Sequence, residues 1–421
     1  MATFIVYLIV LSGTINLIKM ALFLIGSDIY EFNKALTNHN KKCRKYIPFI
    51  SVVIPAHNEE KNIKQTIFSV LNSNYPKDRF EVIVADDGST DNTLDEIKRI
   101  KRSRKHKNLK YFSQSNSGKA NALNNAISQY AKGTLVMCLD ADSQVDSNAL
   151  VNVSHYFRDK RVVGVGSNVK IKNDGTLFSL IQAFEYIVNY QVKRALTTFN
   201  IEYIIGGIGS TFRRSFLKRV NYYDTNTVTE DIDLTLKIIN TGNKKNRVIY
   251  ASDVITYTES VLSFRDLIKQ RLRWKFGRSQ SFLKNKNLFF NRSLKYTKSL
   301  TMLFLPLAIV YDALFLFEPI MSGYLFYLIL RYGDNATFIS AFAVMFFYMI
   351  ANVFLENTLS FKEKIFYLII SPPMYFFFHI LTLAEYIGYL IFLLKLPNLN
   401  KSIENNHCSW VHVGRSGIKI P

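Results

Sequence analysis

The sequence LVMCLDAD, at Leu135–Asp142, is an apolar run that stops at two carboxylates one residue apart. The apolar part predicts a buried strand over Leu135–Leu139, because short runs of this kind fill the interiors of sheets. The triplet Asp140-Ala141-Asp142 then follows the carboxyl end of that strand. An isolated Asp-x-Asp triplet is commonly a solvated turn, so its meaning depends on the segments around it.

The segments before it alternate between strand and helix patterns. Helical spacing is found at 61–71, 90–100 and 119–130. The strand patterns are Phe49–Pro55 (FISVVIP), Phe80–Ala85 (FEVIVA) and Leu109–Phe112. This alternation predicts an α/β domain with a parallel sheet that is covered by helices on both faces. Ligands of such sheets bind at the carboxyl ends of the strands, and the acidic segments fall there.

Two polar segments belong to this predicted edge. Asp86–Asp91 (DDGSTD) is typical of a turn with a helix N-cap, and a cap at a strand end also lies beside the ligand crevice. Gly118-Lys119 places an ammonium group at a helix start, which indicates either a capped surface helix or an anion site. Asp140 and Asp142 can grip Mg²⁺ or Mn²⁺ when the phosphates of a ligand complete the shell.

Two motifs in the second half have both a structural and a chemical interpretation. Thr229–Asp233 (TEDID) opens an amphipathic helix, where acidic residues favour the helix dipole but can also act as a general base. Gln270–Trp274 (QRLRW) belongs to a basic, aromatic helix that is predicted over about 263–283. Alone it indicates an interfacial helix, yet Arg can clamp phosphate oxygens and Trp offers a flat face to a sugar ring.

The composition favours a membrane protein over a nucleic-acid-binding one. The chain of 421 residues carries a net charge of +21 and is 48% hydrophobic. Its densest basic run, Lys98–Lys110, has no aromatic residues interleaved as a platform for bases, so it is typical of a solvated helix end. Cys43, Cys138 and Cys408 are far apart, which argues against a disulfide framework or a zinc site.

Apolar residues concentrate at the two ends of the chain. Residues 1–26 predict a retained transmembrane anchor, and the basic residues after it (Lys34, Lys41, Lys42, Arg44 and Lys45) predict a cytoplasmic central domain. Residues 300–395 predict further transmembrane helices, with breaks expected at Pro319 and at Pro372-Pro373. A tail follows at 396–421. The chain is therefore expected to be a multi-pass protein of the cell membrane.

Six motifs, taken in order, resemble those of the family-2 glycosyltransferases of the processive membrane type, which include cellulose, hyaluronan, chitin-oligosaccharide and poly-N-acetylglucosamine synthases. The motifs are PAHNE (Pro55–Glu59), DDGSTD (Asp86–Asp91), SGKANALN (Ser117–Asn124), DAD (Asp140–Asp142), TED (Thr229–Asp231) and QRLRW (Gln270–Trp274). The resemblance implies a Rossmann-like catalytic domain of the GT-A type over 48–260 and amphipathic interfacial helices over 261–299.

On the donor side, the resemblance implies roles for four residues. Ala56, Asn58 and Asp87 match the residues that bind uridine. Lys119 matches a residue that contacts the diphosphate. A UDP-sugar is therefore the expected donor.

The acidic motifs match the family's metal and catalytic positions. Asp140 and Asp142 match the donor and metal carboxylates, with Asp142 the stronger candidate ligand for Mg²⁺ or Mn²⁺. Asp231 matches the catalytic base, and Glu230 precedes it in the same catalytic motif. These matches imply an inverting transfer that depends on a divalent metal.

The interfacial helix matches the family's acceptor side. Gln270, Arg273 and Trp274 correspond to the motif that holds the diphosphate and shapes the acceptor end. Gly206–Thr211 (GGIGST) falls, by a looser match, where the family has an acceptor-side loop. Ser409-Trp410 and Gly414-Arg415 faintly resemble a Trp-containing C-terminal motif of these synthases.

The branch of poly-β-1,6-N-acetylglucosamine synthases resembles this chain most, so UDP-GlcNAc and a β-linked polysaccharide are the expected donor and product. Hyaluronan and chitin-oligosaccharide synthases typically have Gly-Asp-Asp where this chain has Thr229–Asp231. A single transfer to a lipid acceptor, and a hyaluronan-, chitin- or cellulose-type synthase with another donor, remain as alternatives. A non-catalytic scaffold is disfavoured, because every expected carboxylate is present. The expected partners are membrane lipids, the growing polysaccharide or a lipid acceptor, and a small membrane subunit, with no nucleic acid.

Overall fold

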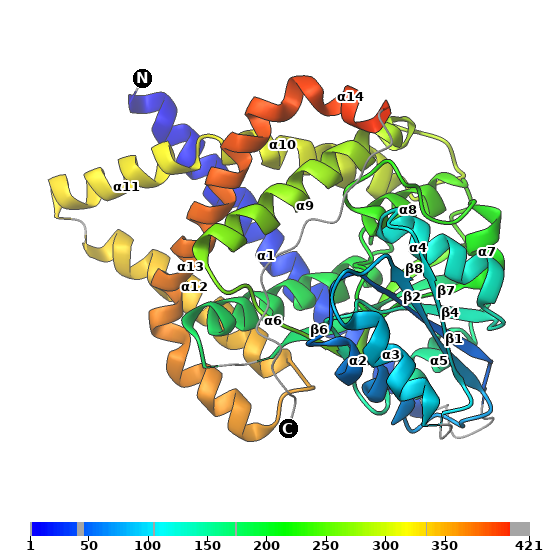
Figure 1. Cartoon of the computed structure of the whole chain (residues 1–421). Helices are drawn as coiled ribbons and strands as arrows, with labels where there is room; N and C mark the ends of the chain where they lie inside the picture. Colours follow the sequence, from blue (N-terminus) through cyan, green and yellow to red (C-terminus); the bar gives the residue numbers. More distant parts are fainter. Residues whose placement is uncertain (1, 40–45, 104–105, 173–174, 334, 405–421) are drawn as a thin grey trace.

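The computed structural model describes residues 2–39, 46–103, 106–172, 175–333 and 335–404. Figure 1 shows a sheet with its covering helices on one side of the molecule and the apolar helices on the other. A long helix, α9, crosses between these two parts. The expected C-terminal motif at 409–415 lies outside the described residues.

The first half of the sheet is parallel, as expected from the alternating pattern. β1 (Ile50–Ala56) pairs in parallel with β2 (Phe80–Asp87) on one side and with β4 (Leu135–Cys138) on the other. β3 (Leu109–Gln114) extends the same parallel arrangement beyond β2. The carboxyl ends of β1, β2 and β4 therefore meet at one edge, and the acidic motifs follow them directly.

The second half of the sheet also contains antiparallel pairs, which the alternating pattern of the first half did not predict. The described strands form one sheet of eight in the order β3-β2-β1-β4-β7-β6-β8-β5. β7 (Ser210–Arg213) runs antiparallel to both β4 and β6 (Val162–Ile171), and β5 (Gln144–Val145) runs antiparallel to β8 (Arg247–Thr258). β7 and β5 are short, so neither carries the long apolar run that marks a buried parallel strand.

Helices cover both faces of the sheet, which confirms the three-layer α/β arrangement. On one face Val52 and Ile54 of β1 pack with Ile67 and Ile97. These belong to α2 (Ile63–Leu71) and α3 (Thr93–Arg102), and α5 (Ala149–Tyr156) covers the same face. The opposite face is covered by α4 (Lys119–Asn125), its π-helical continuation (Ala126–Tyr130), α7 (Arg214–Arg219) and α8 (Glu230–Asn240).

The N-terminal helix α1 extends to His39, well past the predicted end of the anchor at residue 26. Its second half packs on α6 (Leu177–Thr198), where a Cβ on Gly26 would lie 2.7 Å from the Cβ of Ala195. Lys34, which was expected to follow the anchor, is on this helix and donates to the Ser252 hydroxyl at 2.7 Å. These contacts with the catalytic domain keep the chain helical beyond the apolar stretch.

The amphipathic helix that contains QRLRW is present as α9 (Phe264–Lys284), close to its predicted bounds. Ser263 caps it by accepting a hydrogen bond from the amide of Asp266 at 3.1 Å. The segments that follow α9 are a π-helical turn (Ser299–Phe304), α10 (Leu305–Phe315), α11 (Glu318–Tyr332), α12 (Asn335–Leu355), α13 (Phe361–Lys395) and α14 (Leu399–Glu404).

Within the described residues, two helical spans are long and apolar enough to cross a membrane, Ile9–Leu36 and Phe361–Ile403. A third results if Ser299–Phe315 and Glu318–Tyr332, which meet at 56°, count as one span. Pro319 lies in the first turn after that bend, as expected of a break. Phe342–Leu355 is a shorter apolar helix.

The break expected at Pro372-Pro373 is absent, because α13 continues through both prolines. A proline at 372 leaves the carbonyl of Leu368, four residues earlier, without its usual amide partner. The hydroxyl of Ser371 donates to that carbonyl at 2.8 Å. A side chain thus replaces the missing backbone hydrogen bond, and the helix stays intact.

Candidate active site

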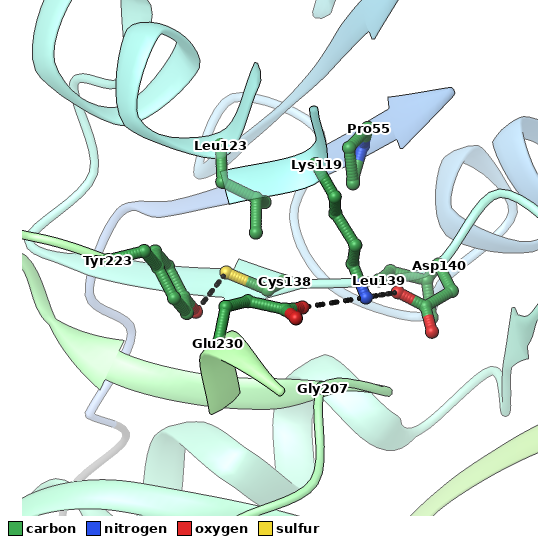
Figure 2. A pocket seen from close by; sticks show the side chains of 9 residues that line it. All are labelled: Pro55, Lys119, Leu123, Cys138, Leu139, Asp140, Gly207, Tyr223 and Glu230. Atoms are coloured by element: carbon green, nitrogen blue, oxygen red, sulfur yellow. Dashed lines mark hydrogen bonds and ion pairs between the residues drawn. The ribbon is translucent and has the colours of Figure 1, made fainter. Parts of the chain in front are cut away.

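A small pocket lies where the carboxyl ends of β1 and β4 meet the first turns of α4 and α8. Figure 2 shows its lining side chains, which come from strand ends, helix starts and the loop before β7. They are Pro55, Lys119, Leu123, Cys138, Leu139, Asp140, Gly207, Tyr223 and Glu230. Three of the predicted site residues, Lys119, Asp140 and Glu230, therefore share one pocket.

Lys119 joins the two acidic motifs through its ammonium group. Its Nζ lies 2.7 Å from Oδ1 of Asp140 and 2.9 Å from Oε1 of Glu230 (Figure 2). Burial alone would lower the pKa of Lys119, but the charges of Asp140 and Glu230 outweigh it and hold that pKa above its ordinary value. The residue therefore carries a fixed positive charge at the pocket.

Asp231 lies next to this group, one residue into α8. A Cβ built on Gly207 would be 3.4 Å from Nζ of Lys119 and 3.6 Å from Oδ2 of Asp231. The side chains of Lys119 and Asp231 therefore both lie against Gly207. Burial and then the charge of Glu230 raise the pKa of Asp231 to about 6, against the opposing pull of Lys119. A carboxylate with this pKa is mostly ionised at neutral pH. The pKa is also close to neutral, which is the range that suits a general base.

Asp87 positions the turn that precedes Lys119. Its carboxylate accepts hydrogen bonds from the amides of Ser117 at 3.0 Å and Gly118 at 2.8 Å, and from the Gln114 side chain at 2.7 Å. Gly118 has a φ of +90°, a region that side chains rarely adopt, so a glycine is needed there. The motifs DDGSTD and SGKANALN are therefore in direct contact.

Ala56 and Asn58 belong to the end of β1 and the turn after it. Ala56 is the last residue of the strand and is fully buried. Asn58 has a φ of +56°, and its Oδ1 accepts a hydrogen bond from the Thr90 amide at 2.8 Å. The turns that follow β1 and β2 are thereby fastened to each other beside the pocket.

The DAD carboxylates fit a cation that takes part of its shell from phosphates. Both offer the hard oxygen donors that Mg²⁺ and Mn²⁺ prefer, and Asp140 already lies against a positive charge on Lys119. Asp142 follows two residues later and accepts a hydrogen bond from the Ser143 hydroxyl at 2.9 Å. In the described part of the chain, no group of three His, Cys, Asp or Glu side chains is placed to hold a metal ion without other ligands.

The QRLRW residues lie on α9, and their side chains differ in environment. Gln270 is buried and accepts a hydrogen bond from Gln182 of α6 at 3.2 Å. Trp274 lies under the Arg271 guanidinium at 4.7 Å, and Arg271 also pairs with Glu185 at 2.6 Å. The Nε of Arg273 is buried and has no hydrogen-bond partner among the described residues.

The structure thus brings together Lys119, Asp140, Glu230 and Asp231. Asp87 holds the turn that precedes Lys119. Gln270 contacts Gln182 of α6, and Trp274 contacts Arg271 within α9. The segment Gly206–Thr211, whose last two residues belong to β7, adjoins the site through Gly207.

Sequence reasoning missed two residues that form the pocket wall. The Sγ of Cys138 and the Oη of Tyr223 lie 3.1 Å apart, and burial raises the pKa of Cys138 to about 12, so this thiol is no nucleophile at neutral pH. Asn124 bonds both the amide and the carbonyl of Tyr223, at 2.9 and 2.8 Å. The only available signal was Asn124 itself, the last residue of SGKANALN.

Comparisons with known proteins find sequences that are described as glycosyltransferases or polysaccharide synthases. Residues 51–220 match the sequence model described as glycosyl transferase family 2. The chain is 27% identical to a poly-beta-1,6-N-acetyl-D-glucosamine synthase of Staphylococcus epidermidis, with 96% of this chain and 97% of the relative aligned. It is 33% identical to a protein of the same description from Staphylococcus aureus strain COL, over 67% of this chain and 64% of that relative.

A solved structure supports the fold independently. A mannosyltransferase from Pyrobaculum calidifontis, in complex with GDP-Man and Mn²⁺, superposes with a TM-score of 0.55 at 20% sequence identity. The match covers 90% of this chain and 98% of that one. The mixed sheet and its helices are therefore of the GT-A type.

Proposed function

The chain is a family-2 glycosyltransferase, and we propose that it transfers N-acetylglucosamine from UDP-N-acetylglucosamine to the end of a growing β-linked polysaccharide. The observation that carries this proposal is the placement of Asp231, a partly buried carboxylate with a pKa of about 6, beside the Lys119–Asp140–Glu230 group. The relatives named poly-beta-1,6-N-acetyl-D-glucosamine synthase support the choice of donor and product.

We assign the proton transfer to Asp231. The acceptor hydroxyl oxygen attacks C1 of the donor sugar, the bond from C1 to the diphosphate oxygen breaks, and UDP leaves with the electron pair. The hydroxyl proton passes to the Asp231 carboxylate. One displacement of this kind inverts the configuration at C1, and Glu230 acts beside it by raising the pKa of the base.

The diphosphate is assigned to two positive groups, one at the pocket and one on α9. Lys119 supplies an ammonium group at the start of α4, and Arg273 supplies a buried Nε that has no partner in the described part of the chain. Asp140 and Asp142 would hold Mg²⁺ or Mn²⁺, whose charge when bound neutralises the leaving diphosphate. Ala56, Asn58 and Asp87, at the ends of β1 and β2, are assigned to the uridine, and Gln270 and Trp274 to the acceptor end.

The apolar helices support a membrane location for the transfer. We propose the organisation expected from the sequence, with the catalytic domain in the cytoplasm and the chain crossing the membrane more than once. The spans Ile9–Leu36 and Phe361–Ile403 and the net charge of +21 support it. Gly388 of α13 contacts α9 closely, since its Cβ would lie 3.2 Å from the Leu272 amide, so the apolar helices adjoin the QRLRW helix.

Purified protein in detergent, supplied with UDP-GlcNAc and Mg²⁺, tests the proposal. UDP release and a ladder of product masses are expected, and UDP-Glc, UDP-GlcA and UDP-Gal should release UDP much more slowly. A single added sugar on a lipid would instead identify a single-transfer enzyme. Faster release from another donor in the panel would overturn the assignment of GlcNAc.

A further inference from the structure

Helix α9 presents one face to the loop that leads into Asp231. Gly277, Gln280 and Lys284 recur at intervals of three and four residues, so they share a side of the helix. A Cβ on Gly277 would lie 2.4 Å from Oγ1 of Thr229 and 2.8 Å from its Cβ, closer than real Cβ contacts allow. Only a glycine at 277 permits α9 to lie so close to the start of α8.

Gln280 connects this loop to the C-terminal helix. Its side chain is almost fully buried, and its Oε1 accepts a hydrogen bond from the Val228 amide at 2.9 Å. Its Nε2 donates to the Ser402 hydroxyl of α14 at 2.9 Å. Val228 precedes α8, so no helical carbonyl is placed to pair with its amide, and the glutamine supplies the acceptor.

Lys284 fixes the same loop from its other end. Its ammonium group donates to Oδ1 of Asn226 at 2.7 Å and to Oδ2 of Asp233 at 2.9 Å. Asp233 is fully buried and lies two residues after Asp231 in α8. The backbone on both sides of Asp231 is therefore held by α9.

We propose that Gln280 is a positioning residue for the transfer, which sets the direction of the Asp231 carboxylate through Val228 and is itself supported by α14 through Ser402. The inference rests on the proposed role of Asp231 as the base. Gln280 lies outside the QRLRW motif, and the contact with Ser402 gives the C-terminal helix a structural link to the catalytic loop.

Four variants of the full chain separate this role from a general effect on folding. Gln280→Met keeps the length of the side chain and removes both hydrogen bonds. Gln280→Glu keeps an acceptor for the Val228 amide. Ser402→Ala removes only the support from α14. Ser281→Ala is the matched control, since Ser281 is buried in the same turn and its hydroxyl donates only to its own helix, at Gly277.

The expected result is a loss in kcat without a loss in donor binding. Gln280→Met should lower kcat by roughly ten- to a hundred-fold, because a displacement of about 1 Å at a reacting group costs on that order. Its KM for UDP-GlcNAc and its affinity for UDP with Mn²⁺ should stay within about two-fold. Gln280→Glu should recover most of the rate, Ser402→Ala should lose a smaller part of it, and Ser281→Ala should match the wild type.

Three outcomes would overturn the inference: a wild-type kcat in Gln280→Met, equal losses in Gln280→Met and Gln280→Glu, or an equal loss in Ser281→Ala. If Gln280→Met does not fold, Gln280→Glu and Ser402→Ala test the inference. The kcat of Gln280→Glu should be near that of the wild type, and the kcat of Ser402→Ala should be lower. Asp231→Asn is run in parallel. Turnover at the wild-type rate in that variant would refute the base assignment itself, so the two failures are distinguishable.

Discussion

The carboxyl group of Asp231 has the environment of a base that titrates close to neutral pH. Burial raises its pKa most, the charge of Glu230 adds to that effect, and Lys119 opposes both, which leaves the pKa at about 6. A general base must be ionised to accept the acceptor proton. At neutral pH most of the molecules therefore hold Asp231 in its active form.

The expected consequence is a fall in kcat/KM as the pH drops through about 6. Because the protonated form is inactive, the loss should approach about ten-fold per pH unit on the acid side, and kcat/KM reports the pKa of the free enzyme. The measurement is UDP release at several pH values, with UDP affinity measured at each as a control. A profile that stays flat well below pH 6 would contradict the assignment.

Asp142 and Arg273 should respond differently to metal. Asp142→Ala should abolish the increase in UDP affinity that Mn²⁺ causes, because the variant lacks a ligand of the cation. Arg273→Ala should keep that gain and weaken UDP binding by about 1.5–3 kcal/mol, the range for a charge-assisted hydrogen bond. Titration of UDP with and without Mn²⁺ measures both. An unchanged metal response in Asp142→Ala would disprove its role as ligand.

Among single residues, the sequence predicts those site residues that belong to a recognisable motif. It misses those whose role depends on packing in the folded protein. Lys119, Asp140 and Asp231 stand in short patterns at strand or helix ends, so their convergence could be expected. Tyr223 and Gln280 stand in no pattern. They act through partners far along the chain, Cys138 for the first and Val228 for the second, and such contacts exist only once the fold has formed.

Among the elements, α13 shows how a local rule is overridden by one side chain. The proline pair predicts a break, yet the hydroxyl of Ser371 satisfies the carbonyl of Leu368, and the helix continues past the prolines to Lys395. β7 shows the opposite case. Its four residues carry too little apolar pattern to be predicted, but by pairing with β4 and β6 it turns a parallel sheet into a mixed one.

The Ser371 hydrogen bond can be tested by its removal. Ser371→Ala should destabilise the protein by about 1–3 kcal/mol, because a buried carbonyl loses its partner in an apolar environment. Thr382→Ala is the matched control on the same helix, because the Phe378 carbonyl that accepts from its hydroxyl also receives the usual helical hydrogen bond. Unfolding in detergent measures both. Equal effects of the two variants would contradict the role given to Ser371.

On the scale of the whole molecule, one buried arginine fastens the apolar helices to the catalytic domain. Arg194 of α6 is fully buried and lies 2.9 Å from Oε2 of Glu356, just after α12, and 3.4 Å from Oε1 of Glu31 on α1. It also donates to the Leu355 carbonyl at 2.7 Å. The sequence predicted the apolar helices as separate segments, but nothing in it indicated that they share this contact.

Arg194→Met should therefore destabilise the protein strongly, by about 3–5 kcal/mol, because it leaves the Glu356 carboxylate buried without its partner. The double variant Arg194→Met with Glu356→Leu should recover much of that loss, since no unpaired charge remains. Thermal or denaturant unfolding in detergent measures the free energies. The single variant Glu356→Leu is measured as well. If the double variant loses as much free energy of unfolding as the two single variants lose together, the pairing is contradicted.

The most direct test of the account is a comparison of turnover and UDP binding in the wild type and Asp231→Asn, in detergent with Mn²⁺. The variant keeps the size of the side chain and removes its ability to accept a proton. Turnover of UDP-GlcNAc should fall by roughly 10²–10⁴-fold, the contribution of a general base, while the affinity for UDP stays within about two-fold. Turnover that persists at the wild-type rate, or that is lost together with UDP binding, would contradict the assignment of Asp231 as the base.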